Sequence, residues 1–185
     1  MKTKSISKEA ILSAGKEIVA QSGINALNIR NLAQRCSISV GSVYNYFPSK
    51  GDLIIATIES VWQEILYESN IDQVTLGFTE HIEFLFRNIQ KGSEKYPSFF
   101  SVHPMSLANV HKTTGREVMH QYVEHMKQSL LNALAQDPNV KEDIFTETFT
   151  QTSFVDFVFS NIITLLSNGK NDCTYLLEIV GHILY

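Results

Sequence analysis

The eight residues 40–47, VGSVYNYF, concentrate side chains that can contact nucleic acid without carrying any charge. Their polar members are Ser42, Tyr44, Asn45 and Tyr46. Serine and asparagine can hydrogen-bond base edges, and tyrosine hydroxyls can donate to phosphates. Gly41 has no side chain and lets the backbone come close to DNA. The segment therefore predicts a DNA-contacting element.

The two tyrosines of this segment cannot both be core residues. Tyr44 and Tyr46 are two positions apart and lie on opposite sides of a helix, so a small unit can bury only one of them. Val43 and Phe47 are four apart and are expected to face the core. Core aromatics are the alternative explanation for this pattern, and we accept that explanation for Phe47.

The elements around this segment have the proportions of a helix-turn-helix. Apolar spacing predicts a first helix from Ser7 to Gly23 and a second one that Asn28 caps and that ends near Cys36. A turn over residues 37–39 then leads to a third helix over 40–47, with Ser39 as its N-cap. In a helix-turn-helix, this last helix enters the major groove of DNA.

Charge is distributed unevenly over the 185 residues. Residues 1–50 carry seven basic and two acidic residues, a net charge of +5, whereas the remainder carries eight and 17, a net charge of −9. The total of −4 argues against a protein that coats nucleic acid or anionic membrane over its whole surface. A basic N-terminal part favours DNA as the partner of that part alone.

The stretch SISVGSVYNYFPSKGDL resembles the defining segment of the tetracycline-repressor (TetR) family of bacterial regulators. The family pattern is a small residue, Gly, Ser or Thr, an aliphatic residue, Tyr, any residue, Tyr-Phe, two residues and Lys, then an aliphatic residue three further on. The matching positions are Gly41, Ser42, Val43, Tyr44, Tyr46, Phe47, Lys50 and Leu53. The resemblance covers about residues 8–53.

This resemblance implies particular DNA contacts. Phosphate contacts are implied for Asn28, Tyr46 and Lys50, and base or groove contacts for Gly41, Ser42, Tyr44 and Asn45. Asn45 occupies a position that varies in the family, so we expect it to help set the operator sequence. Two departures matter: Asn28 replaces the usual Thr and can still cap, and Ser37 replaces a usual Gly, so a left-handed backbone there would be strained.

The acidic remainder is expected to be helical and to mediate dimerisation. Helices are predicted over about 50–67, 73–95, 97–111, 114–136, 142–168 and 173–185, which makes the fold class all-α. We expect a DNA-binding domain at 1–48 and a ligand-binding and dimerisation domain at 49–185. Apolar residues surround more of the last two helices than one packed face needs, which predicts a four-helix dimer interface. An intrachain core is the alternative.

Ligand contacts are predicted only by residue type. The candidates are Trp62, Phe86, Phe99, Phe100, His103, Met119, Tyr122 and Met126. Taken singly, such residues are more often core than pocket. A pocket that they line would suit a hydrophobic or aromatic small molecule. No cofactor, metal constellation, catalytic motif, secretory signal or apolar span is recognised, so we expect a cytoplasmic protein that is not an enzyme and has no membrane partner.

The working hypothesis is a homodimeric repressor that binds a palindromic double-stranded DNA operator and is released by a small molecule. Two alternatives stay open. One is a DNA-binding protein of the same fold without a small-molecule effector, controlled by a protein partner. The other is an all-α enzyme or cofactor carrier with an unused helix-turn-helix.

Overall fold

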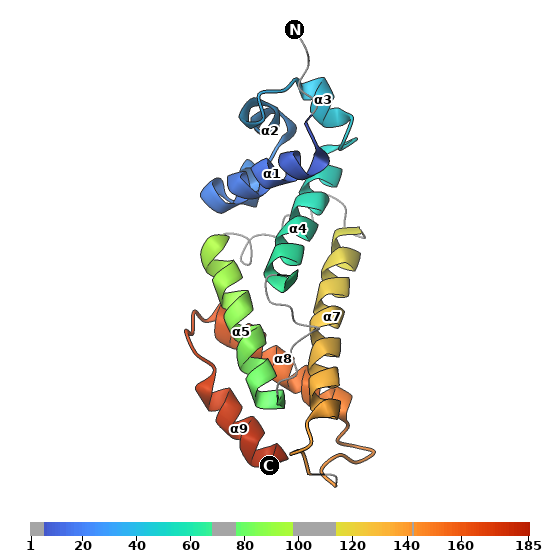
Figure 1. Ribbon diagram of the computed structural model, residues 1–185, viewed down its shortest axis with the longest axis vertical. Coiled ribbons are helices and arrows are strands. Elements are labelled where there is room, and N and C mark those ends of the chain that lie inside the picture. Colours follow the sequence, from blue (N-terminus) through green and yellow to red (C-terminus); the bar gives the residue numbers. More distant parts are fainter. Residues whose placement is uncertain (1–5, 68–76, 98–113, 142) are drawn as a thin grey trace. The chain divides into compact units, whose positions relative to one another are not determined.

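The computed structural model describes residues 6–67, 77–97, 114–141 and 143–185, and every regular element in these ranges is helical (Figure 1). The elements are α1 (Lys8–Ser22), a 3-10 turn η1 (Ile24–Ala26), α2 (Ile29–Arg35), α3 (Val40–Tyr44), α4 (Lys50–Tyr67), α5 (Phe78–Lys95), α7 (Thr114–Gln136), α8 (Gln151–Ser167) and α9 (Thr174–Leu184). The all-α prediction is confirmed. No helix in the described ranges is long and apolar enough to cross a membrane.

The chain divides into two compact units. The first contains residues 1–64 and 92–119, and the second contains residues 65–91 and 120–185. Helices α4, α5 and α7 each contribute residues to both units. These units are defined by packing alone, so the functional boundary that we predict between residues 48 and 49 stays a prediction.

In the first unit, α1, η1, α2 and α3 pack on one another around a small apolar core. Its fully buried members include Ile11, Val19, Leu27, Leu32 and Val43. Helix α4 begins with a cap, because the Ser49 hydroxyl accepts the Asp52 amide at 3.1 Å and donates to the Asp52 carboxylate at 2.8 Å. The same short polar signals that the sequence displays therefore define where these helices begin.

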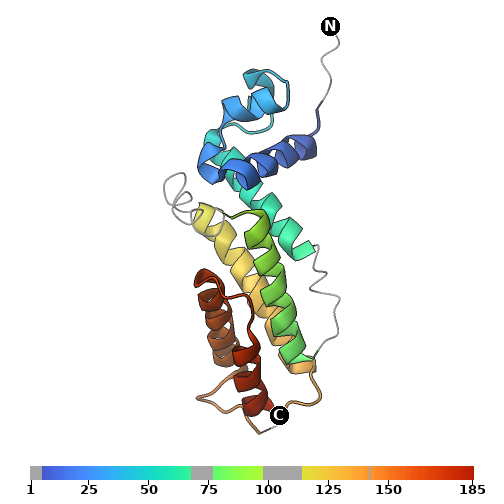
Figure 2. The same cartoon turned by 90° about the vertical axis from the view of Figure 1, so that its left-hand side faces the viewer.

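The second unit is held by α5, α7, α8 and α9 (Figure 2). The rings of Phe78 on α5 and Phe154 on α8 lie 6.0 Å apart between centroids. Asp137, which follows α7, is buried and accepts the Phe78 amide at 2.8 Å and the Tyr185 hydroxyl at 2.5 Å. One carboxylate thus joins the start of α5 to the end of the chain that follows α9.

Two helix boundaries and one 3-10 turn differ from the predictions. The third helix ends at Tyr44 instead of Phe47, because Asn45 caps it and the Tyr46 amide turns back to the Val43 carbonyl. A 3-10 turn was not expected between α1 and α2. Helix α8 begins at Gln151 rather than at 142.

The late start of α8 has a local cause. Residues 143–150 are not helical; the Thr146 hydroxyl accepts the Phe149 amide, and Thr150 caps α8 by accepting the Ser153 amide. Threonine hydroxyls that bond the backbone in this way compete with helix formation. The predicted helix over 97–111 lies almost entirely outside the described residues. The predicted start of the helix over 73–95 also lies outside them, and the described part of that helix, α5, begins at Phe78.

Candidate nucleic-acid interface

The entry to α2 is fixed by Asn28. Its side-chain oxygen accepts the Asn31 amide at 3.0 Å, which caps the helix, and its Nδ2 donates to the Ala26 carbonyl at 3.2 Å. The predicted cap is confirmed. One amide hydrogen of half-buried Asn28 is engaged in this way, and the other is the donor that a phosphate would take.

The turn between α2 and α3 is a Schellman motif. The Ser37 amide donates to the Gln34 carbonyl at 3.1 Å, and the Ile38 amide donates to the Ala33 carbonyl at 3.0 Å. Ser37 has a φ of 53° and is the only residue other than glycine with a positive φ in the described ranges. The backbone there is left-handed, at the position where the sequence raised the question of strain.

Helix α3 presents one side to solvent. Val40 and Tyr44 are 41% and 49% exposed, Gly41 and Asn45 are exposed, and Val43 and Phe47 are buried. This is the expected division between an outer face and a core face. Tyr44 is thus the tyrosine that cannot be explained as a core residue.

Two of the predicted contact residues already have partners within the chain. Ser42 is half-buried, and its hydroxyl lies 2.8 Å from the hydroxyl of Ser39, the residue that caps α3. Tyr46 is also half-buried, and its hydroxyl donates to the Ile6 carbonyl at 2.5 Å. The Tyr46 proton can reach a phosphate only if this bond to Ile6 opens, so its contact stays a prediction.

Basic side chains around these helices fall into two groups. Arg35 pairs with Glu17 at 2.7 Å, and Lys16 pairs with Glu64. Lys8, Arg30 and Lys50 are exposed and form no ion pair with any residue in the described ranges. The ammonium of Lys8 lies 5.8 Å from the centre of the Phe47 ring. Within the described part of this region, these three cations are exposed and without an ion pair, so an anionic partner could contact them.

Arg30, like Lys8, is an exposed cation that the sequence analysis did not single out. It lies in the first turn of α2, two positions after the capping Asn28, and its side chain is exposed. The signal was present in the charge count of the N-terminal part, but the count does not separate a solvent-facing cation from one neutralised by a neighbour, as Arg35 is.

The ligand candidates are divided between the units. Trp62 belongs to the first unit and is buried. Phe86 and Met126, which are buried, and Tyr122, which is half-buried, belong to the second. Phe99, Phe100 and His103 lie outside the described residues, and so does the side chain of Met119. Their grouping around one ligand stays a prediction.

A buried polar pair in the second unit was not anticipated. The His81 Nε2 on α5 lies 3.2 Å from the Ser129 hydroxyl on α7, and both side chains are buried. The Ser129 hydroxyl also donates to the Met126 carbonyl at 2.8 Å. Sequence spacing does not reveal this pair, because its members are 48 residues apart.

Comparison with known families gives a match for the helix-turn-helix region. Residues 11–57 match the family described as bacterial regulatory proteins, tetR family. The chain is 27% identical over 93 residues to the transcriptional repressor KstR of Mycolicibacterium smegmatis, a match that covers 49% of this chain and 45% of the relative. The transcriptional regulator YuxN of Bacillus subtilis is 25% identical over 48% of this chain and 36% of that relative. The chain thus spans less than half the length of these curated relatives.

Solved structures resemble the fold over nearly the whole chain. The fatty acid degradation regulator FadR of Bacillus halodurans aligns with a TM-score of 0.64 at 16% identity, covering 96% of this chain and 97% of that one. FadR of Bacillus subtilis, in complex with stearoyl-CoA, aligns with a TM-score of 0.59 at 15% identity, covering 94% of this chain and 93% of that one. The multidrug binding protein EbrR, complexed with imidazole, aligns with a TM-score of 0.59 at 18% identity, covering 95% of this chain and 93% of that one. At identities of 15% to 18%, these likenesses show the helical fold.

Proposed function

We propose, from the match of residues 11–57 to the tetR family of bacterial regulatory proteins, that this chain is a homodimeric repressor that reads a palindromic operator through α3 and releases it when a small molecule binds. The observation that carries the DNA-binding part is the outer face of α3. Tyr44 is 49% exposed there while the neighbouring Val43 is fully buried. An exposed aromatic residue beside Asn45, on the second helix of a helix-turn-helix, is placed to meet base edges.

The proposed DNA surface combines this face with the helix α2 entrance. Asn45, Tyr44 and Gly41 approach the groove, while Arg30 and Lys50 neutralise phosphates on either side. Both cations are exposed, so DNA binding removes no intrachain ion pair of the described residues. Contacts from Asn28, Ser42 and Tyr46 complete the proposal.

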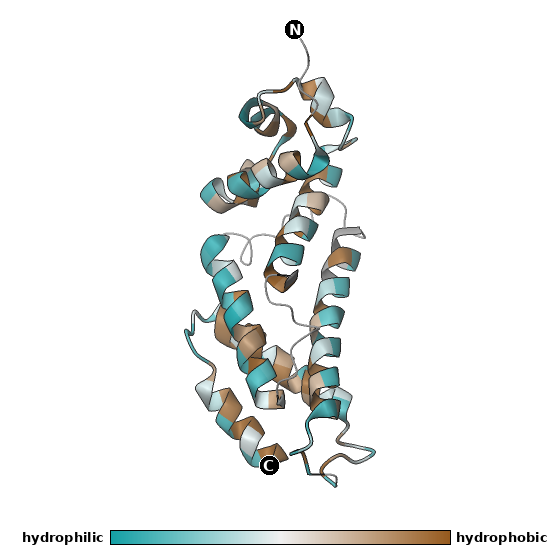
Figure 3. Cartoon of the chain, viewed as in Figure 1, coloured by the Kyte–Doolittle hydropathy of each residue, from teal (hydrophilic) through white to brown (hydrophobic). Residues whose placement is uncertain are grey.

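Dimerisation is supported by the exposed apolar residues of α8 and α9, whose hydrophobic stretches are coloured brown in Figure 3. Phe157 and Ile163 on α8 are 47% and 38% exposed, and Tyr175 on α9 is 75% exposed. A dimer would bury these side chains and place two recognition helices about 34 Å apart, one turn of DNA. We therefore propose that α8 and α9 of two copies form a four-helix interface.

The dimer proposal is tested by changing one apolar side chain. Phe157→Glu should shift the protein to monomer in analytical ultracentrifugation and lower operator affinity at least tenfold, because a buried carboxylate in the interface is costly. The matched control is Gln121→Glu, an exposed position on α7 that gains the same charge. A Phe157→Glu protein that stays dimeric refutes this interface.

The effector is proposed to be a small hydrophobic or aromatic molecule. Support comes from the apolar side chains of Phe86 and Met126 in the second unit and from the solved relatives, one with stearoyl-CoA and one with imidazole. The test titrates the operator complex with long-chain acyl-CoA and, separately, with hydrophobic aromatic compounds. A tenfold loss of operator affinity is expected from one of these classes. No effect from either would favour control by a protein partner.

The DNA-binding proposal is tested by selecting sequences from fragmented genomic DNA with the purified protein. The expected result is an enriched palindrome, with Asn45→Ala relaxing the preference at particular base positions and Tyr44→Ala lowering affinity. Gln63→Ala, an exposed position on α4, is the control and should behave as the unchanged protein. Selection without any enriched sequence would contradict the proposal.

A further inference from the structure

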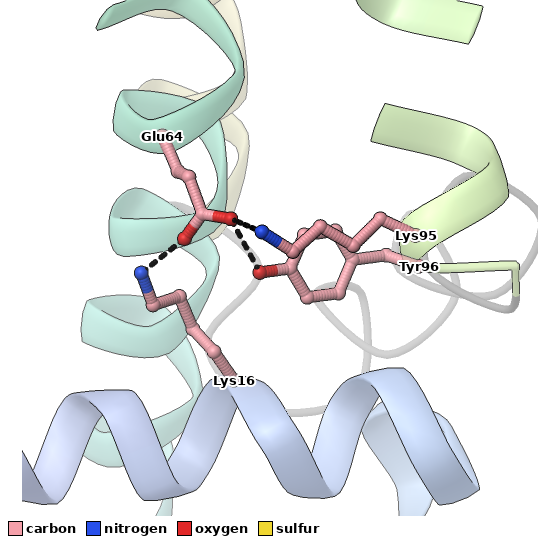
Figure 4. A network of polar contacts seen from close by, with 4 residues as sticks. All are labelled: Lys16, Glu64, Lys95 and Tyr96. Carbon is pink, nitrogen blue, oxygen red and sulfur yellow. Dashed lines mark hydrogen bonds and ion pairs between the residues drawn. The ribbon is translucent and has the colours of Figure 1, made fainter. Parts of the chain in front are cut away.

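Glu64, on α4, connects two elements that are far apart in the sequence. One carboxylate oxygen, Oε2, forms an ion pair with Lys16 of α1. The other, Oε1, forms an ion pair with Lys95 at the end of α5 and accepts the Tyr96 hydroxyl at 3.0 Å. Figure 4 shows Lys16 on one side of the carboxylate and Lys95 and Tyr96 on the other. All four residues belong to the first unit.

The carboxylate of Glu64 is held in its charged form. Its side chain is only 15% exposed. Burial would raise its pKa, but hydrogen bonds from Lys16, Lys95 and Tyr96 outweigh that effect and keep the pKa below its ordinary value. The ammonium groups of Lys16 and Lys95 share one carboxylate, so removal of any partner of Glu64 changes how strongly the others interact with it.

Helix α1 is attached to α4 at a second place. Gly15 faces Thr57 so closely that a Cβ at Gly15 would lie 3.1 Å from the Thr57 hydroxyl oxygen. Thr57 and Glu64 are seven residues apart on α4, about 10 Å along the helix axis. The close approach at Gly15 and the Lys16–Glu64 pair therefore attach α1 to α4 at two places.

The position of the network in the chain gives it a role beyond stability. Glu64 is the last residue that α4 contributes to the first unit, and Lys95 and Tyr96 lie just after α5 enters that unit at Gly92. A shift of the segment 92–96, which lies in the same unit, would therefore pull on Oε1, turn the carboxylate, and loosen Lys16 on Oε2. Helix α1 in turn packs against α2, which packs against α3.

We propose that Glu64 is a positioning residue that couples the end of α5 to α1 and thereby sets operator affinity. This inference rests on the proposed DNA-binding function. Lys95 and Tyr96 would then influence DNA binding although neither belongs to the helix-turn-helix. The intact network holds α1, and with it α3, in the arrangement that binds DNA.

The test measures operator affinity of the full-length protein at several salt concentrations. Lys16→Met, Lys95→Met and the uncharged change Tyr96→Phe are each expected to weaken binding, the lysine variants by about fivefold and Tyr96→Phe by less. Because these residues act through one carboxylate, the Lys16→Met/Lys95→Met double variant should lose less than the product of the single losses. The salt dependence should keep its slope, since no phosphate contact is removed.

The matched control is Lys91→Met, which removes an exposed cation one turn earlier on α5 that forms no ion pair within the described ranges. It should leave affinity unchanged. The proposal is overturned if Lys95→Met and Tyr96→Phe bind as the unchanged protein does, if the lysine losses multiply independently, or if Lys91→Met weakens binding equally. Failure of the unchanged protein to bind any selected sequence would instead refute the proposed function.

Discussion

Gly41 offers a substitution that should make the protein more stable and its DNA binding weaker. A Cβ at Gly41 would meet only the Ser39 hydroxyl oxygen, at 3.7 Å, which is an ordinary van der Waals contact. Within the described part of the chain, packing therefore gives no reason for a glycine in α3. Alanine is favoured over glycine in a helix by about 0.5–1 kcal/mol, so Gly41→Ala should stabilise the fold by up to that amount.

The loss of affinity follows from the proposed position of Gly41 against DNA. A methyl group forced into a close-packed contact costs about 1–3 kcal/mol, which corresponds to a roughly fivefold to hundredfold increase in Kd. Thermal unfolding followed by circular dichroism, together with fluorescence anisotropy on the selected operator, measures both quantities. The thermal midpoint should rise by about 1–4 °C. Unchanged operator affinity in a folded Gly41→Ala protein would refute the close approach of DNA at this residue.

Three further predictions concern turns, acid stability and phosphate contacts. Ser37→Gly should stabilise the fold by about 0.5–1 kcal/mol, because glycine adopts a left-handed backbone without strain. Gly169 occupies the equivalent place after α8 and has a φ of 67°, so Gly169→Ser should destabilise the fold by a similar amount. Urea unfolding of both variants measures these changes. Burial would raise the pKa of Asp137, but hydrogen bonds from Tyr185 and two backbone amides hold it below its ordinary value. The stabilisation is therefore present above about pH 4 and is lost as pH falls through the lowered pKa, so Asp137→Asn should cost about 1–3 kcal/mol at pH 7 and progressively less as the pH falls through that pKa. Arg30→Met should reduce the slope of log affinity against log salt by about 0.9, and an unaltered slope would exclude a phosphate contact.

Local signals in the sequence predicted the starts of the helices in the helix-turn-helix region correctly. Asn28 and Ser39 cap the helices that they were expected to cap, because a capping hydroxyl or amide acts on a backbone amide three residues away. The left-handed backbone at Ser37 was not itself predicted; only the family's usual Gly at this position drew attention to it.

Features that depend on distant residues were not predictable in this way. The bonds of Asp137 to Phe78 and Tyr185 join segments 59 and 48 residues apart. The partners of Glu64 are similarly distant, at 48 residues for Lys16 and 31 for Lys95. Apolar periodicity also extended α8 too far, since Phe145 and Phe149 have helical spacing but stack on each other, with ring centroids 5.7 Å apart, outside the helix.

The most direct test of the central claim is the salt dependence of binding to the best sequence that the purified protein selects from genomic DNA. We expect a palindromic site bound by a dimer, with a log affinity that falls steeply and linearly with log salt and an affinity that drops when Tyr44 or Asn45 is replaced by alanine. A protein that selects no sequence, or that binds DNA equally well after both replacements, would contradict it.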